Sequence, residues 1–290
     1  MKLTRKLLGL GVALAVSGAA QSATVDQTLF AGFQQLSDNS AEVLLNPDGS
    51  IDATGIINMG DRLRSIFTIE TVEKAGNPTR GLGAGSGNNE LSGIADITVT
   101  NILNPAAGIF IYSFSATAGL AAEFGLAGTS AAIVLFEDPA AEYERTTGAT
   151  CTSAAINGDC EDNVNDGAVY AAFGFGGGNG AWTAQAVTND INVIGAVPAP
   201  GNGGTFNVGL VNIAGGSHTA TFGNVACGVG GTVQICGSGS LLGIGGVTTP
   251  YDIFDNIDFT INNAVPAPAT LALFGAGLLG FSATRRRSSK

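Results

Sequence analysis

Polar and apolar residues alternate with a period of two in several short stretches of this 290-residue chain. The clearest case lies near the end, where Ile257, Phe259 and Ile261 alternate with Asp258, Thr260 and Asn262. This period is typical of a strand with one face in a core and the other in water. Similar runs predict strands at residues 56–73, 91–103, 108–117, 130–138, 168–175, 181–188 and 205–213.

Turn-forming sequences separate these runs: NPDG at 46–49, GNP at 76–78, GSGNN at 85–89 and GGGNG at 176–180. Short strands at this spacing indicate an all-β domain with antiparallel strands. We therefore predict a β-sandwich or jelly-roll-like domain over residues 24–262. The Pro- and Gly-rich stretch at 195–204 is the best candidate for an internal boundary, and a surface turn is its simplest interpretation.

The N-terminal 23 residues have a different pattern. Lys2, Arg5 and Lys6 precede an uncharged core at residues 7–16, and small residues follow. This is the three-part organisation of a secretory signal peptide, whose helical core is too short to span a bilayer comfortably. We predict that residues 1–23 direct the chain to the general secretion machinery.

The C-terminal segment, residues 263–290, combines three features. The tetrapeptide VPAP at 265–268 precedes an apolar run, which predicts a transmembrane helix at about 269–284. Its prolines lie where a helix begins, a position that tolerates proline. Arg285, Arg286 and Arg287 follow at once, and such a cluster stays on the cytoplasmic side of a membrane.

Together these features resemble the PEP-CTERM sorting tail of Gram-negative bacteria. Val265, Pro266, Ala267 and Pro268 correspond to the motif, although Ala267 stands where the family usually has Glu. The resemblance implies a transient anchor in the inner membrane and cleavage by an exosortase-like membrane peptidase. It also implies delivery to the cell surface or to an extracellular matrix that contains exopolysaccharide. The second VPAP, at 197–200, lacks the apolar run and the arginines.

Charge narrows the range of partners. Between the two terminal segments, five Lys and Arg residues stand against 23 Asp and Glu residues, which gives a net charge of −18. Such a charge repels nucleic acids and anionic membranes and favours solubility and cations. We therefore expect no nucleic-acid partner.

Four cysteines form two pairs with equal spacing, Cys151 with Cys160 and Cys227 with Cys236. Four cysteines allow three pairings, and the equal spacing favours the two local ones. Disulfides suit an exported protein.

Two acidic loops are candidate calcium sites. NPDGSID offers Asn46, Asp48, Ser50 and Asp52, and CEDNVNDG offers Asp162 and Asp166. Calcium takes six to eight oxygen ligands, and carboxylate and amide groups supply them. Neither loop follows the EF-hand spacing, however, and acidic turns also occur without metal, so both interpretations stay open.

Catalytic motifs are few. The single histidine, His218, is expected on the surface, and no G-x-S-x-G elbow accompanies it. Trp182, Tyr170, Phe173 and Phe175 fit a core better than a sugar-stacking platform. We predict a non-enzymatic adhesion or matrix protein, as in biofilms or flocs. A carbohydrate- or ice-binding module is the alternative, and a hydrolase with two facing acids is a third.

Overall fold

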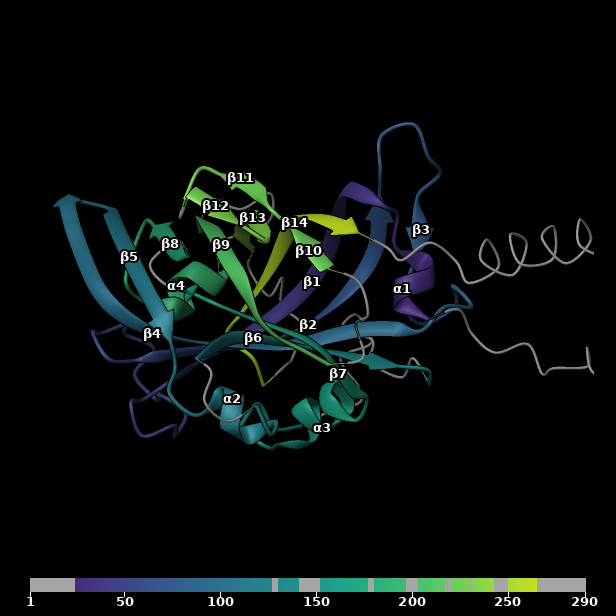
Figure 1. Ribbon diagram of the computed structural model, residues 1–290. Helices are drawn as coiled ribbons and strands as arrows, with labels where there is room; N and C mark the ends of the chain where they lie inside the picture. Colours follow the sequence, from purple (N-terminus) through teal and green to yellow (C-terminus); the bar gives the residue numbers. More distant parts are fainter. Residues whose placement is uncertain are drawn as a thin grey trace, which may run out of the picture.

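The computed structural model describes residues 24–126, 130–140, 152–176, 180–196, 203–216, 218, 221–229, 231–242 and 250–264. Most of the described chain is β-structure (Figure 1). The strands are β1 Gly32–Leu45, β2 Arg62–Glu73, β3 Arg80–Gly81, β4 Glu90–Ala106, β5 Ile109–Ala116, β6 Ala131–Asp138, β7 Ala168–Gly174, β8 Ala181–Ala186, β9 Gly204–Gly215, β10 Thr221–Gly223, β11 Val225–Cys227, β12 Gly231–Val233, β13 Ile235–Leu242 and β14 Ile253–Ala264. The helices are α1 Val25–Thr28, α2 Leu120–Glu123, α3 Asp159–Asn165 and α4 Ile191–Ala196.

Eight antiparallel strands close into a barrel in the order β2-β1-β14-β13-β9-β7-β6-β4, and β4 pairs again with β2. Two strand pairs, β6–β7 and β5–β8, connect β4 with β9. The first part of β4 pairs with β6 and its later part with β5, while β9 pairs with β8 first and with β7 further along. The long strands β4 and β9 therefore hold both the β6–β7 pair and the β5–β8 pair.

The predicted strands are confirmed, but the predicted sandwich is not. A sandwich needs two separate sheets, whereas here the β2–β4 pairing joins the two ends of one sheet. The strands on both sides of residues 195–204, β8 and β9, pair directly with each other. The antiparallel all-β class therefore holds, and the architecture is a closed barrel.

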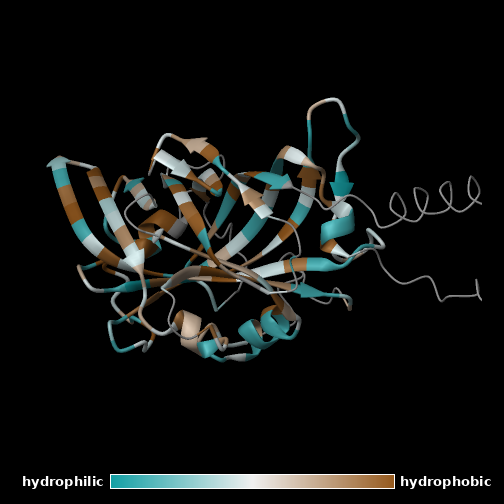
Figure 2. Ribbon diagram, in the orientation of Figure 1, coloured by the Kyte–Doolittle hydropathy of each residue, from teal (hydrophilic) through white to brown (hydrophobic). Residues whose placement is uncertain are grey.

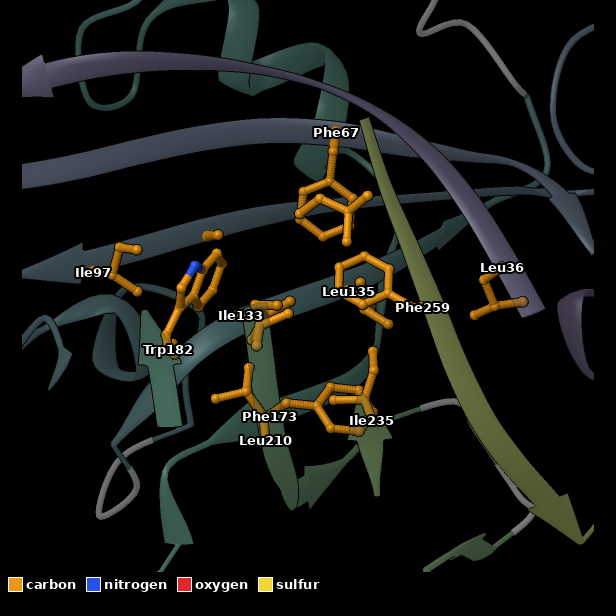
Figure 3. Packing of buried hydrophobic residues seen from close by; sticks show 14 of the residues in the cluster. Leu36, Phe67, Ile97, Ile133, Leu135, Phe173, Trp182, Leu210, Ile235 and Phe259 are labelled. Atoms are coloured by element: carbon orange, nitrogen blue, oxygen red, sulfur yellow. The ribbon is translucent and has the colours of Figure 1, made fainter. Parts of the chain in front are cut away.

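The period-two pattern places one set of side chains inside the barrel. Figure 2 shows apolar and polar bands alternating along the strands, and Figure 3 shows Phe67, Trp182 and Phe259 in the interior. Gly93 makes room for one of these rings, because a Cβ there would lie 2.4 Å from the ring of Phe67. Small barrels commonly place a glycine opposite a large ring to fit side chains into their tapered interior.

Helix α1 closes one end of the barrel and α4 the other. Val25, Leu29 and Phe30 of the α1 segment are buried in the main core, and Ile191 and Ile194 of α4 join the same core. The start of β1 and the end of β14 pair at the α1 end, with Gly32 opposite Asn263. The described chain therefore enters and leaves the barrel at the same end (Figure 1).

None of the helices in the described part of the chain is long and apolar enough to cross a bilayer. The predicted signal peptide at residues 1–23 and the predicted transmembrane helix at about 269–284 lie outside the described residues.

Candidate functional site

One side of the barrel presents a continuous polar surface. It consists of the outward side chains of β8, β9, β13 and β14, and we call it the outer polar face. Its members are Thr183, Gln185, Thr205, Asn207, Ser238, Ser240, Asn256 and Asp258. All eight are exposed or half-buried, and Asp258 is the one charged residue among them.

The strand register aligns the outer polar face into two rows. Asn207 lies opposite both Thr183 and Ser238, and Ser238 lies opposite Asp258. The second row repeats this arrangement with Gln185, Thr205, Ser240 and Asn256. Side chains in one row are about 4.8 Å apart and the rows about 6.7 Å apart, because strand geometry sets both spacings. The result is a regular array of hydroxyl and amide groups.

The opposite side of the barrel is covered. Outward residues of the strands, among them Ile66 and Val134, pack with Leu120 of α2 and with Cys160 and Val164 of α3. Figure 1 shows α2 and α3 lying along this side, next to β6 and β7. The two short helices thus convert one outer side of the barrel into a second apolar core.

A buried ionic cluster lies between these helices and the barrel. Arg64 of β2 forms five hydrogen bonds with three carboxylates: one with Asp96, two with Glu123 and two with Glu161. Its Nε lies 2.5 Å from a Glu161 oxygen, and Arg62 adds a bidentate pair with Asp96. We call these five residues the Arg64 cluster. It uses every donor of the Arg64 guanidinium.

The electrostatics of Arg64 follow from this arrangement. Burial alone lowers the pKa of the Arg64 guanidinium, but the hydrogen bonds with Glu161 and Glu123, together with the negative charges of these carboxylates, outweigh burial and raise the pKa above its ordinary value. Arg64 therefore stays charged. It ties α2 and α3 to the barrel, since Glu123 ends α2 and Glu161 lies in α3.

Two more carboxyl groups lie inside the barrel, and we call them the inner carboxyl pair: Glu42 of β1 and Asp255 of β14. Both are 5% exposed. Ser65 of β2 donates to a Glu42 oxygen at 3.1 Å. Glu42 lies opposite Ile253, two residues from Asp255, so the two acids are diagonal neighbours on the inner side of adjacent strands.

The inner carboxyl pair faces a cavity of about 50 Å³. Apolar and aromatic side chains form most of its lining, including Phe67, Trp182 and Phe259 (Figure 3). Ile57 and Ile194 line it on the side of α4. Among the described residues, none that lines the cavity is Lys, Arg or His.

Helix α4 is held over this cavity by hydrogen bonds. Ile191 N donates to Gly55 O, and Ile57 N donates to Asn189 O, both at 2.8 Å. Gly55 has a φ of +71°, and a Cβ there would lie 1.9 Å from the Asn192 amide. Only glycine allows both the backbone conformation and the close approach of α4.

The prediction that His218 lies on the surface is wrong. Its side chain is 2% exposed, and its Nδ1 lies 2.6 Å from Asp26 of α1. The ring packs against Tyr170 and Phe222, with centroids 4.7 and 4.2 Å apart. Tyr170 also donates to Asp26, and burial followed by the Asp26 charge raises the pKa of Tyr170. These contacts anchor α1 at its end of the barrel.

The candidate calcium residues do not converge. The hydroxyl and N–H of Ser50 lower the pKa of Asp48, and the Thr54 hydroxyl lowers the pKa of Asp52. Each carboxylate therefore accepts hydrogen bonds within the turn in which it lies. Asp162 lies in α3 and Asp166 follows it. Within the described ranges, no group of three or more His, Cys, Asp or Glu side chains is arranged to hold a metal. Calcium binding stays a prediction.

The predicted Cys227–Cys236 disulfide is confirmed, with Cα atoms 5.6 Å apart. It joins the β11–β12 hairpin to β13. Cys160 is also disulfide-bonded, and its predicted partner Cys151 lies outside the described residues. The aromatic residues Trp182, Tyr170 and Phe173 are buried, as the core interpretation predicted.

The sorting motif Val265–Pro268 and the arginines at 285–287 also lie outside the described residues. Residues 264–287 nevertheless match the family model of the PEP-CTERM protein-sorting motif, which confirms the predicted resemblance. Such a tail implies export, targeting to the cell surface or beyond, and processing by an exosortase-type membrane protease. No curated protein and no solved structure matches the chain.

Sequence reasoning missed the outer polar face and the inner carboxyl pair. The stretches TAQA and DFTINN did contain part of the outer polar face, but only the register of four strands assembles it. Glu42 and Asp255 gave no local signal, because they are 213 positions apart and are brought together by the β1–β14 pairing.

Proposed function

We propose that this exported protein is a non-enzymatic component of the cell surface or extracellular matrix, where it binds neutral regions of exopolysaccharide through its outer polar face. The tail match carries the export part of this proposal. The adhesion or matrix role, as in a biofilm or floc, rests on the following observations.

The topology favours attachment by one end. Strand β14 leads directly into the sorting tail, and the chain also enters the barrel beside the end of that strand. A barrel retained through its tail would therefore be attached at the α1 end. The α4 end would point away from the attachment point, and the outer polar face, on the wall between the two ends, would stay accessible.

The chemistry of the outer polar face fits a polysaccharide. Hydroxyl and amide groups donate and accept hydrogen bonds in the same way as sugar hydroxyls do. The segment between the terminal signals has a net charge of −18, yet the face has one charged residue among its eight. A neutral region of a polysaccharide can approach this surface at little electrostatic cost.

The absence of enzymatic activity is part of the proposal. His218 is enclosed by Tyr170, Phe222 and Asp26, which supports a structural role for it. The inner carboxyl pair is a poor glycosidase site, because a cavity of about 50 Å³ is too small for a sugar ring between two acids. A hydrolase is therefore the weakest of the three candidates.

The alternative on the same export route is ice binding. The two aligned rows of the outer polar face favour it, since Thr205, Ser238 and Asn256 supply a repeating hydroxyl and amide surface. Thermal hysteresis of the purified protein tests this alternative directly. Freezing-point depression without any retention on polysaccharide would replace the proposed function with this one.

The proposed function is tested by co-sedimentation of the full chain with exopolysaccharide from its own cells. We expect Asn207→Glu, in the centre of the outer polar face, to reduce the bound fraction at least about fivefold through lost hydrogen bonds and added charge. Asn77→Glu is the matched control, because Asn77 is exposed in the turn between β2 and β3. Equal binding by both variants, or none by the unmodified protein, would contradict the proposal.

A further inference from the structure

We propose that the barrel interior binds a small neutral apolar molecule in the cavity that Trp182 shares with Ile194 of helix α4. A short hydrocarbon or halocarbon of about three heavy atoms represents this class of ligand. The site is separate from the sorting tail and from the outer polar face, because its lining side chains point into the barrel.

The cavity arises where short side chains follow one another on the inner side of the barrel. Strand β8 directs Trp182, Ala184 and Ala186 inward, and Ala95 of β4 lines the same space. An alanine side chain is a single methyl group, so it fills little of the interior. Space therefore remains beside these alanines.

The volume of the cavity sets the size of the ligand. A water molecule needs about 10–15 Å³ of such volume, so a cavity of about 50 Å³ holds roughly three to five water-sized groups. Protein interiors contain few voids larger than one water molecule. Atoms that line an unfilled void lose van der Waals contacts, and a ligand of matching size restores these contacts.

The lining sets the polarity of the ligand. Aromatic rings form much of it, among them Phe67, Trp182 and Phe259 (Figure 3). Tyr112 also lines the cavity, and its hydroxyl donates to Thr188 O at 3.2 Å, so this polar group already has a partner within the protein. Aromatic and aliphatic side chains pack against apolar molecules through dispersion and burial of apolar surface. An apolar ligand therefore matches most of this lining.

The polar part of the lining is confined to one side. Glu42, Ser65 and Asp255 come from the adjacent strands β1, β2 and β14, and Ser65 donates to Glu42. The proposed ligand makes no bond with these groups. Water is the competing occupant, but a buried water needs about two to four polar partners. The apolar side of the cavity therefore favours an apolar ligand over water.

Helix α4 provides the route of entry. Ile57 and Ile194 line the cavity at the α4 end, where Ile191 N donates to Gly55 O and Ile57 N donates to Asn189 O. The strand pairs that surround the cavity are held by longer hydrogen-bonded registers. Displacing α4 breaks fewer hydrogen bonds than separating two strands, so the ligand would enter beside α4.

Quenching of tryptophan fluorescence tests the proposal, because Trp182 lines the cavity and is the one tryptophan of the chain. The full chain, in an uncharged detergent, is titrated with dichloromethane, a small neutral apolar quencher. A vapour phase of known composition sets the free concentration of dichloromethane, so uptake by the detergent does not change it. We expect saturable quenching with an unchanged lifetime of the remaining fluorescence, as a bound quencher produces. Acrylamide, a polar quencher of similar size, should give only linear quenching with a shortened lifetime.

A variant that fills the cavity locates the site. Ala184→Val extends an inward side chain into the space that the ligand needs. We expect it to weaken dichloromethane binding at least about fivefold, because a close-packed interior cannot hold both groups. Ala181→Val is the matched control on the same strand, since alternation along β8 directs residue 181 to the other side. Its affinity should stay within about twofold of the unmodified protein.

Three results would overturn the proposal: linear quenching by dichloromethane with a shortened lifetime, saturable quenching by acrylamide with equal affinity, or unchanged dichloromethane affinity in folded Ala184→Val protein. If Ala184→Val does not fold by circular dichroism, the comparison of the two quenchers on the unmodified protein still decides the question. A failure to bind polysaccharide would leave this outcome unaffected, because the outer polar face lies on the opposite surface of the wall.

Discussion

Two groups of buried carboxylates in this protein have different hydrogen-bond partners. In the Arg64 cluster, on the outside of the barrel, Arg62 and Arg64 face Asp96, Glu123 and Glu161. In the cavity, Glu42 and Asp255 share a mostly apolar lining with Ser65, and the described part of that lining contains no basic side chain. The outer acids are fixed by charge-assisted hydrogen bonds with arginine, whereas Glu42 accepts a hydrogen bond from the neutral hydroxyl of Ser65. We therefore expect the removal of one charge to cost more stability in the Arg64 cluster than in the cavity.

The largest effect is expected for Arg64→Met. The substitution keeps much of the side-chain volume but leaves Asp96 and Glu161 buried without their main cation. Removing one partner of a buried ion pair costs about 3–5 kcal/mol. Urea unfolding of the full chain in uncharged detergent measures the loss, with the half-buried Lys74→Met, outside the Arg64 cluster, as the control. A loss below about 1 kcal/mol would show that the Arg64 cluster does not hold α2 and α3.

A smaller loss of stability is expected when one of the two glutamates of the Arg64 cluster is replaced, and the two glutamates should differ. Glu161 has a 1% exposed side chain and accepts from Arg64 at 2.5 and 2.7 Å, while Glu123 is 21% exposed. Glu161→Gln should lower the unfolding free energy by about 1.5–3 kcal/mol, because a buried charged hydrogen bond is lost. Glu123→Gln should cost less than about 1 kcal/mol, since solvent screens that pair. Equal losses in the same unfolding assay would contradict this order.

The inner carboxyl pair should respond more weakly than the Arg64 cluster. Glu42→Gln keeps an acceptor for the Ser65 hydroxyl and removes one of the two acidic groups in the cavity. We expect the unfolding free energy at pH 7 to change by less than about 1 kcal/mol, because glutamine keeps the side-chain volume and the hydrogen bond with Ser65. Chemical denaturation measures this change. A loss as large as that of Glu161→Gln would contradict this expectation.

The smallest effect is expected at Asp252, which is half-buried and belongs to neither the Arg64 cluster nor the inner carboxyl pair. Burial raises the pKa of its carboxyl from the ordinary 3.8, and its hydrogen bond from Leu44 N at 2.8 Å opposes that shift. The raised pKa means that ionised Asp252 lowers stability at pH values above its folded pKa. Asp252→Asn should therefore be slightly more stable than the unmodified protein at pH 7.

The sign of this difference gives a pH test. Below about pH 3.8 the Asp252 carboxyl is protonated in both the folded and the unfolded state, so the advantage of Asp252→Asn should disappear. Thermal melting between pH 3 and pH 7 follows the change. An advantage that grows as the pH falls would contradict the assigned direction.

Local pattern was enough to predict strands whose inner residues are apolar. Strand β14 is such a case, because Ile257, Phe259 and Ile261 alternate with polar residues. Strand β1 was missed for the opposite reason: its inner positions include Asp38, Ser40 and Glu42, which hide the alternation. At its bulge, Asp38 accepts from Ile257 N at 2.5 Å and replaces a ladder hydrogen bond. A strand with polar residues on its inner side cannot be predicted from hydrophobic periodicity.

His218 shows the same limit at a single residue. Its neighbours in sequence are small and polar, which suggested a surface position. Its partner Asp26 is 192 residues away, and the rings of Tyr170 and Phe222 come from two other strands. Burial of a side chain depends on these distant contacts, so no short stretch of sequence predicts it.

The linear sequence was sufficient for the sorting tail, the charge balance, the Cys227–Cys236 pair and most strands, because each depends on residues close together along the chain. Barrel closure, the Arg64 cluster, the outer polar face and the inner carboxyl pair depended on tertiary structure. Each requires strands far apart in sequence to pair in one register, and a shift of one residue would exchange the inner and outer side chains.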